Sequence, residues 1–306
     1  MALTPQQRID RLNRWKTPPS AAEEARLERA RRMVTDAVRG HPPFASLGLV
    51  VEAKGSWANN TNVRSDSDMD IKVEFTQRVF RGSTTGMGYW DQVFLNNAYK
   101  GRWTPQEFRS ELGIALKAAS DYVDASHKVA FYVPSVPGSR PDTDVVPCFT
   151  YRSEAGYRRP SQQGTVVFTT DGKHIVNWSQ QQLDNGRAKN SRTGYRYKFA
   201  VRGLKSVEND LADLGLIKDL PSYFMEGLVY NVPDETLRAP ASLDGAFQGA
   251  LAHLKGQFGC WSWNANPDGM VEPNEIKKLF GPNQKWTKDD AHQLLIRAWD
   301  HLGYGG

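Results

Sequence analysis

The sequence predicts an α+β protein with two lobes: a mixed β-sheet braced by a long N-terminal helix, followed by a lobe made of helices. Two observations carry this prediction. From Asp68 to Phe75 polar and apolar residues alternate, which is the period of a half-buried strand. From Tyr195 to about Leu214 apolar residues instead recur at helical spacing. No internal repeat or linker clearly divides the chain, so we place a soft boundary and expect domains at 1–185 and 186–306.

The long N-terminal helix has a recognisable start. Ser20 followed by Glu23 is a capping-box pattern, and apolar residues then keep helical spacing as far as Gly40. A helix with one apolar stripe is expected to brace a sheet. A shorter helix over 5–15 precedes it and ends before Pro18-Pro19.

The remaining elements follow from the same two periodicities. Alternation predicts strands, and Asp171-Gly172 predicts a hairpin turn between the last two of them. The expected strands are 47–53, 68–75, 128–133, 142–151, 165–170 and 174–178. The further expected helices are 105–124, 195–214, one that begins near 221, 240–258 and 287–302. Residues 80–103 are rich in glycine and aromatic side chains and are interpreted as a loop.

The composition is that of a globular protein. Of the 306 residues, 39% are hydrophobic and 24% charged, which argues against wholesale disorder. The net charge of +5 suits a polyanion such as nucleic acid or nucleoside triphosphates, but no dense Lys/Arg tract requires RNA or DNA. Cys148 and Cys260, without zinc spacing or a disulfide framework, indicate a reducing, cytoplasmic setting. No apolar run is long enough for a signal core or a membrane span.

Asp68 and Asp70 lie on one face of the predicted strand, because alternate residues of a strand point the same way. Two carboxylates about 7 Å apart repel each other unless a positive group lies between them, and a divalent metal is the obvious candidate. An ordinary Asp-Ser turn is the alternative interpretation. Asp144 lies near the start of the strand over 142–151 and would bring a third carboxylate to the same place if the two strands are neighbours. Asp66 lies outside the alternating strand and is not a ligand candidate.

Three carboxylates on a mixed sheet suit nucleotidyl transfer by two metal ions. Ions roughly 3.5 to 4 Å apart need bridging acids; one lowers the pKa of an attacking ribose hydroxyl, and the other neutralises the triphosphate and the leaving pyrophosphate. We therefore expect two Mg²⁺ ions, with Mn²⁺ as a substitute. Asp68, Asp70 and Asp144 are the expected metal ligands and catalytic residues. The backbone amides of Gly55 and Ser56, with the Ser56 hydroxyl, are expected to hold the β- and γ-phosphates.

The helix over 195–214 carries cations on the face opposite its apolar stripe. Lys198, Arg202, Lys205 and Asn209 recur there at four-three-four spacing. This pattern predicts a cationic ridge, for which an ordinary solvated helix face is the alternative.

Five motifs, in order along the chain, resemble the signature of the cGAS/DncV-like nucleotidyltransferases. They are Gly55-Ser56, Ser67-Asp68-Met69-Asp70, Asp144-Val145-Val146-Pro147, Arg202-Gly203-Leu204-Lys205 and Pro221-Ser222-Tyr223-Phe224-Met225-Glu226. The likeness runs from about residue 20 to residue 302. These proteins are bacterial relatives of animal cyclic GMP-AMP synthase and belong to the polymerase-β-like superfamily. The resemblance implies a bilobed enzyme that joins nucleoside triphosphates into a cyclic di- or trinucleotide.

The resemblance also implies roles for residues further along the chain. Lys205 would contact the donor triphosphate, Ser222 the phosphates or the ribose, and Tyr223 would stack on a base. The alternatives are a surface lysine, and a helix N-cap followed by a core tyrosine. Asn177 lies where the chain should pass the donor pocket, and its amide can pair with a base edge. In this family an asparagine in the region can accompany acceptance of uracil; a structural turn asparagine is the other interpretation.

Partners follow from the resemblance as well. The cyclic product typically signals in antiphage defence by activating a separate effector. The terminal Gly306 follows Gly305, and this end resembles tails that ubiquitin-type machinery joins to other molecules, with a frayed end as the simpler interpretation. Two other function classes stay open: a polymerase-β-like transferase that modifies RNA, protein or a small molecule, and a catalytically silent nucleotide-binding module. The three intact aspartates argue against the silent module.

Overall fold

The computed structural model describes residues 2–16, 20–63, 68–82, 96–97, 101, 103–154, 160–259, 265–282 and 284–305. The chain divides into two compact units, each made of separate segments. The sheet unit comprises Pro19–Ala58 and Arg64–Ser179. The helical unit comprises Met1–Pro18, Asn59–Val63 and Gln180–Gly306. The α+β class predicted from the sequence is confirmed.

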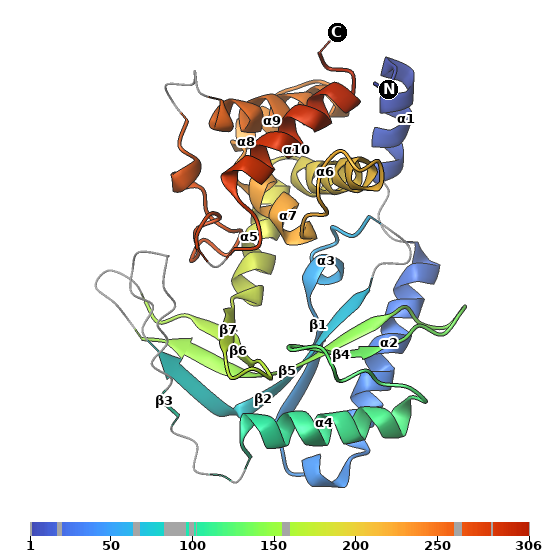
Figure 1. Ribbon diagram of the computed structural model, residues 1–306, viewed down its shortest axis with the longest axis vertical. Helices are drawn as coiled ribbons and strands as arrows, with labels where there is room; N and C mark the ends of the chain where they lie inside the picture. The colour runs from blue at the N-terminus through green and yellow to red at the C-terminus, as the bar shows by residue number, and fades with distance from the viewer. Residues whose placement is uncertain are drawn as a thin grey trace. The chain divides into compact units, whose positions relative to one another are not determined.

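In the described part of the sheet unit, seven strands form one mixed sheet (Figure 1). They are β1 (Leu49–Ala53), β2 (Met69–Gly82), β3 (Asn96–Asn97), β4 (Phe131–Val133), β5 (Thr143–Ser153), β6 (Gln163–Phe168) and β7 (His174–Asn177). The order is β1-β2-β5-β6-β7, with β3 beside β2 and β4 beside β5. β2 and β5 pair in parallel, and the other pairs are antiparallel. The hairpin expected around Asp171-Gly172 is the β6–β7 pair.

Two long helices of the sheet unit, α2 (Ala21–Arg39) and α4 (Pro105–Ala119), contact each other and pack on the sheet (Figure 1). Both begin with a capping box, at Ser20 and at Thr104 respectively. In each box the cap side chain and the glutamate three residues later bond each other's backbone amides, which satisfies donors that a helix start leaves unpaired. Two short elements complete the unit, the 3-10 helix Pro42–Phe44 and the single turn α3 (Gly55–Ala58).

The alternation in β2 separates an apolar face from a polar one. Ile71, Val73 and Phe75 are fully buried. The Phe75 ring lies 5.6 Å from that of Phe108 in α4, measured between centroids. Residues with even numbers, among them Asp70, therefore lie on the opposite face of this part of β2. Burial of the odd-numbered side chains thus determines which way the acids point.

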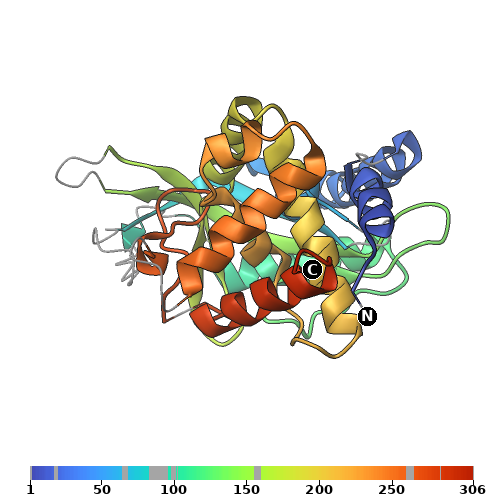
Figure 2. The ribbon, with the colours of Figure 1, turned by 90° about the horizontal axis from the view of Figure 1, so that it is seen from above.

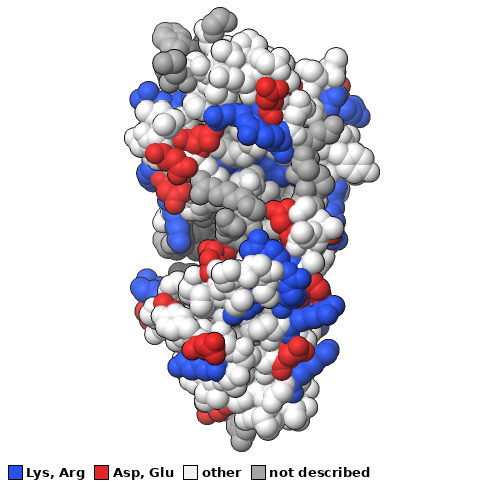
Figure 3. Space-filling model, turned by 90° about the vertical axis from the view of Figure 1, so that its right-hand side faces the viewer, with Lys and Arg blue, Asp and Glu red and all other residues white. Residues whose placement is uncertain are grey.

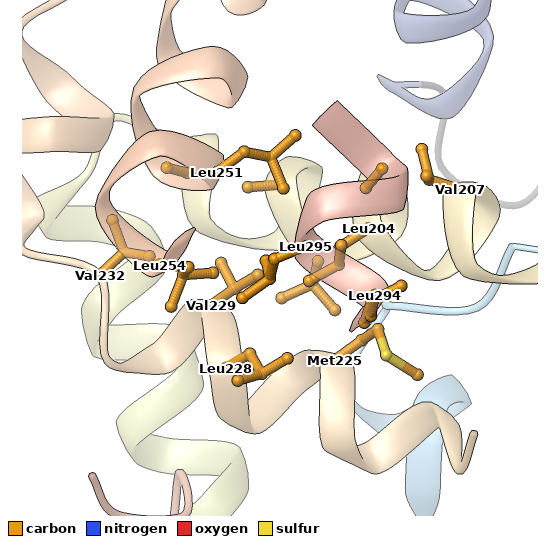
Figure 4. Close-up of a cluster of buried hydrophobic side chains, with 14 of the residues drawn as sticks. Leu204, Val207, Met225, Leu228, Val229, Val232, Leu251, Leu254, Leu294 and Leu295 are labelled. Carbon is orange, nitrogen blue, oxygen red and sulfur yellow. The ribbon is translucent and has the colours of Figure 1, made fainter. Parts of the chain in front are cut away.

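The helical unit is built around one apolar core, to which several helices contribute leucines (Figure 4). The helices are α1 (Pro5–Lys16), α5 (Ser179–Arg192), α6 (Arg196–Asp213), α7 (Ser222–Tyr230), α8 (Asp234–Arg238), α9 (Leu243–Phe258) and α10 (Lys288–His301), with a 3-10 turn at Pro267–Gly269. Leu204, Leu228, Leu254 and Leu294 come from four different helices and are fully buried. α9 and α10 lie side by side (Figure 2).

The first helix belongs to the helical unit, whereas the sequence groups it with the strand-rich half. Leu12 lies in the helical core. The buried Arg8 donates hydrogen bonds to Asp244 Oδ1 (2.9 Å) and to the Leu302 carbonyl (2.7 Å). Its guanidinium also lies 4.4 Å from the ring centroid of Tyr304. All three partners are at least 236 residues away in sequence, so no local pattern near α1 could reveal them.

The sequence patterns also miss α5 and α8. α5 is strongly polar, and Gly186 and Lys189 are its buried residues, so no apolar stripe marks it. Lys189 Nζ donates to the Val232 carbonyl (2.8 Å) and to Asp234 Oδ1 (2.7 Å). A buried lysine thus joins α5 to the first residue of α8.

Charged side chains of both signs are interspersed on the face that Figure 3 shows. This agrees with the small net charge of +5. Among the described residues, no helix combines the length and the apolar character needed to cross a bilayer.

Two glycines inside helices of the helical unit should respond in opposite ways to alanine. An added Cβ at Gly203 of α6 would lie 2.9 Å from the Phe247 ring, whereas at Gly256 of α9 no neighbouring atom lies within 4 Å. Gly203→Ala should lower the free energy of unfolding by roughly 1 to 3 kcal/mol through overpacking. Gly256→Ala should raise it by roughly 0.5 to 1 kcal/mol, because alanine is the better helix former. Chemical denaturation followed by circular dichroism measures both, and changes of the same sign would contradict this packing.

Candidate active site

Two neighbouring strands bring the predicted acids together. β2 and β5 run parallel, and their register sets Asp70 directly opposite Asp144. Asp68 directly precedes β2 and shares the face of Asp70, because alternate residues of an extended chain point the same way. The expectation that the strand of Asp144 neighbours the strand of Asp70 is confirmed.

The three carboxylates repel one another. Burial raises the pKa of Asp144, and the charges of Asp70 and Asp68 raise it further. Burial also raises the pKa of Asp68, with help from Asp142 and Asp70. Among the described residues, no three acidic, histidine or cysteine side chains form a ready-made metal cage. The donor chemistry nevertheless fits a divalent cation, since a hard cation takes carboxylate oxygens and offsets their mutual repulsion.

A fourth acid nearby, Asp142, is committed to a structural role. Its Oδ1 accepts hydrogen bonds from the Tyr132 hydroxyl (2.7 Å) and from the Ser135 amide (2.6 Å). Burial acts to raise the pKa of Asp142, but these bonds and the nearby Arg140 lower it overall. This environment distinguishes it from Asp144, two residues later, whose pKa is raised.

The chain between β1 and β2 approaches Asp70 closely. Gly55 has a φ of +72°, and a Cβ at this position would lie 2.4 Å from Asp70 Oδ2, so only glycine fits. Lys54 Nζ lies 3.9 Å from Asp70 Oδ1, and the Lys54 amide donates to the Asp70 carbonyl (2.9 Å). Ser56 lies in the single helical turn α3. The sequence patterns single out Gly55 and Ser56 but miss Lys54. Its position directly before Gly55 is the one sequence feature that could have indicated a role at the site.

Sheet register places Asn177 on the acid-bearing face. Asn177 pairs with Thr165 of β6, and Thr165 pairs with Thr150 of β5. Paired residues share a face, and Thr150 and Asp144 are separated by an even number of residues along β5. The Thr150 hydroxyl donates to Glu74 Oε1 (2.6 Å), which shows that Glu74 and the other even-numbered residues of β2 before the register shift after Phe75 lie on this same face. Asn177 is half-buried and is the last residue of β7.

Lys205 lies on the predicted cationic face of α6 and is buried there. It is 2% exposed, and Arg202 on the same helix is 8% exposed. Lys205 Nζ donates to Thr61 Oγ1 (3.2 Å), and Arg202 Nη1 donates to the Asn60 carbonyl (2.9 Å). The alternative of a solvated helix face is therefore wrong for Lys205 and Arg202, because residues 59–63 from a distant part of the sequence contact this face.

Ser222 and Tyr223 begin α7. Ser222 is exposed, and Tyr223 is half-buried. The Tyr223 hydroxyl donates to Glu272 Oε2 (2.9 Å), and its ring centroid lies 6.3 Å from that of Trp286. Burial raises the pKa of Tyr223 well above its usual value, and Glu272 adds to the effect. The phenol is thus neutral and is held from its hydroxyl end.

The predicted site residues divide between the two units. The helical unit holds Lys205, Ser222 and Tyr223, and the sheet unit holds Gly55, Ser56, Asp68, Asp70, Asp144 and Asn177. Three further residues that the sequence patterns single out lie outside the described residues: Asp66, Cys260 and Gly306.

Comparisons with known proteins give consistent matches. The family model of the cGAS/DncV-like nucleotidyltransferase C-terminal helical domain matches residues 184–303. A cyclic dipyrimidine nucleotide synthase of Legionella pneumophila is 32% identical over 292 residues, which cover 94% of this chain and 96% of that protein. A cyclic dipurine nucleotide synthase of Elizabethkingia meningoseptica is 28% identical, with 95% and 96% covered. The structure of an Elizabethkingia meningoseptica cyclic dinucleotide synthase with GTP and Apcpp matches with a TM-score of 0.78 and 26% identity, covering 99% of this chain and 100% of that one.

Gly55→Ala should strongly slow nucleotidyl transfer without unfolding the protein, because the added methyl group must displace the Asp70 carboxylate. We expect kcat to fall by about a hundredfold or more, as for other displacements of about 1 Å at a reacting centre. Gly172→Ala is the matched control: Gly172 also has a positive φ, +81°, but nothing lies within 4 Å of an added Cβ. It should keep the wild-type rate of pyrophosphate release. Full activity of Gly55→Ala would show that Asp70 does not need its present position.

Proposed function

Because this chain belongs to the cGAS/DncV-like nucleotidyltransferases, we propose that it is a cyclic oligonucleotide synthase. In this proposal it joins nucleoside triphosphates into a cyclic di- or trinucleotide and releases pyrophosphate at each step. The observation that carries the proposal is the register of β2 and β5, which sets Asp70 opposite Asp144 with Asp68 on the same face. Carboxylates that repel one another cost folding free energy, so a sheet that only packed a core has no use for them.

We propose that Asp68, Asp70 and Asp144 hold two divalent ions, Mg²⁺ with Mn²⁺ as a substitute. When bound, such ions lower the pKa of the attacking ribose hydroxyl and neutralise charge on the triphosphate and the leaving pyrophosphate. The chain itself orients one of these ligands. Lys54 Nζ, 3.9 Å from Asp70 Oδ1, and the close backbone of Gly55 confine the Asp70 carboxylate from two directions. Confinement before substrate binds reduces the reorganisation that the reaction needs.

The remaining site residues are proposed to bind the nucleotides. The amides of Gly55 and Ser56, with the Ser56 hydroxyl, would hold the β- and γ-phosphates. Lys205 would contact the donor triphosphate, and Ser222 the phosphates or the ribose. Tyr223 would stack on a base, a role that suits any base because every base has a π-face. The hydroxyl bond that holds the Tyr223 ring supports this role, because an ordered ring loses little freedom on binding.

We propose that the bases joined include a pyrimidine, uracil first among them. The Legionella relative is named for cyclic dipyrimidine synthesis. Asn177 lies on the acid-bearing face of the sheet, and its side-chain amide offers a base edge both a donor and an acceptor. A relative of similar coverage is named for cyclic dipurine synthesis, so base choice depends on such individual side chains rather than on the fold.

The proposed setting is the cytoplasm, where the cyclic product would activate a separate effector in antiphage signalling. The low cysteine content of the chain supports a reducing compartment. Cys148 is a buried free thiol, and burial raises its pKa to about 12, which makes it unreactive. Conjugation through Gly306 stays a prediction from the sequence alone.

One incubation tests this function directly. Purified protein with labelled ATP, GTP, CTP and UTP and either Mg²⁺ or Mn²⁺ should give phosphatase-resistant products that mass spectrometry identifies as cyclic, with uridine among them. The double variant Asp68→Ala with Asp70→Ala should give none while its circular dichroism spectrum stays that of the wild type. Label found only on added RNA or protein would refute the cyclic product. If the double variant turned over as fast as the wild type, the assignment of Asp68 and Asp70 as metal ligands would be wrong.

A further inference from the structure

Residues 59–63, here called the anchored segment, lie between two groups of predicted site residues along the sequence. Gly55 and Ser56 precede it and Asp68 follows it, yet this segment groups with the helical unit. Asn59 and Thr61 are 5% and 0% exposed, although both have polar side chains. Buried polar side chains need partners, and here the partners come from α6 and α7.

The main partner is the carboxylate of Glu226, which lies in α7 and is 2% exposed. Glu226 Oε1 accepts hydrogen bonds from Asn59 Nδ2 (3.0 Å) and from Gln182 Nε2 of α5 (3.0 Å). Glu226 Oε2 accepts a longer bond from Thr61 Oγ1 (3.5 Å). One buried side chain thus joins two helices to the anchored segment.

Thr61 connects this network to Lys205. Its Oγ1 accepts from Lys205 Nζ (3.2 Å). Two charged groups act on this buried ammonium: Glu226 from α7 favours its protonated form, and Arg202 from α6 disfavours it. Residues 59–63 themselves contribute no titratable side chain. Glu226 is therefore the negative charge that offsets the burial of Lys205.

We propose that Glu226 is a positioning residue for triphosphate binding, because its carboxylate fixes residues 59–63 and, through Thr61, the Lys205 ammonium. This inference rests on the proposed function, in which Lys205 contacts the donor triphosphate. Glutamine at this position would still accept the bond from Asn59, but it would remove the negative charge. The charge of Glu226 and the shape of its side chain can therefore be tested separately.

Glu226→Gln should weaken triphosphate binding. We expect the KM for nucleoside triphosphates to rise about tenfold, with a smaller change in kcat, because Lys205 binds the ground state and the transition state alike. Calorimetric titration with a non-hydrolysable triphosphate analogue should show a matching loss of affinity. This binding readout separates the two hypotheses. If Glu226→Gln binds the analogue more weakly than the wild type does, but the wild type forms no cyclic product, the function is refuted and the positioning role is kept.

The pH profile distinguishes positioning from a merely structural role. Burial lowers the pKa of Lys205, and loss of the Glu226 charge lowers it further. The alkaline limb of kcat/KM should therefore move to lower pH in Glu226→Gln. Adding Lys205→Arg should remove that shift, because a guanidinium stays protonated throughout the range.

Asp244→Asn is the control for lost stability. It removes a partly buried carboxylate that pairs with Arg8 in the same unit, 2.9 Å away, and should lower the melting temperature without moving the pH profile. If Glu226→Gln fails to fold, Glu226→Asp replaces it and should keep the wild-type alkaline limb while raising KM. The proposal would be overturned if Glu226→Gln kept the KM and the pH profile of the wild type. It would also be overturned if Asp244→Asn moved the alkaline limb of kcat/KM as far as Glu226→Gln does.

Discussion

The candidate site depends on one constraint: the register of two parallel strands holds like charges on one face of a sheet. Asp70 lies directly opposite Asp144 because β2 and β5 pair in that register. The same alternation buries Ile71 and Val73 on the other face. A slip by one residue would move the acids into the apolar core and the apolar side chains out of it. The packing of the core therefore fixes the position of the carboxylates, and burial, together with the charges of Asp70 and Asp68, raises the pKa of Asp144.

Residues 55–63 are continuous in sequence but belong to two units: residues 55–58 to the sheet unit and residues 59–63 to the helical unit. Gly55 contacts the Asp70 carboxylate closely, and residues 59–63 are anchored by helices of the helical unit. The anchors are charged: Arg202 binds the Asn60 carbonyl, and Glu226 binds Asn59. A stretch that appears in the sequence as a glycine-serine turn before a strand is thus also a buried segment of the helical unit. Helix residues far along the chain therefore hold the segment that follows Gly55 and Ser56 in the sequence.

Local sequence patterns predict those features that depend only on residues close together in the sequence. Period-two alternation gives β2 and its polar face, and a capping box gives the start of α2 at Ser20. Adjacency of β2 and β5 follows from matching two acid-bearing strands to one chemical task, and that prediction is confirmed.

Features that depend on distant contacts could not be predicted in this way. Helical spacing correctly shows that Lys205 lies opposite the apolar stripe of α6, but it cannot show that Thr61 covers it. α1 joins the helical unit through Arg8, whose partner Asp244 is far away in sequence. The contacts of Glu226 with Asn59 and of Lys54 with Asp70 likewise join residues that no sequence spacing rule relates.

Binding of Mn²⁺ tests the central claim, that repelling carboxylates on this face form a divalent-cation site. Electron paramagnetic resonance measures free Mn²⁺ during titration of the wild type, of Asp144→Asn and of Asp142→Asn, each with a non-hydrolysable triphosphate. Asp142 is the matched control, because Tyr132 and Ser135 already occupy its carboxylate. We predict that the wild type and Asp142→Asn bind Mn²⁺ alike and that Asp144→Asn loses at least tenfold in affinity, about 1.4 kcal/mol. Equal binding by wild type and Asp144→Asn would contradict the account.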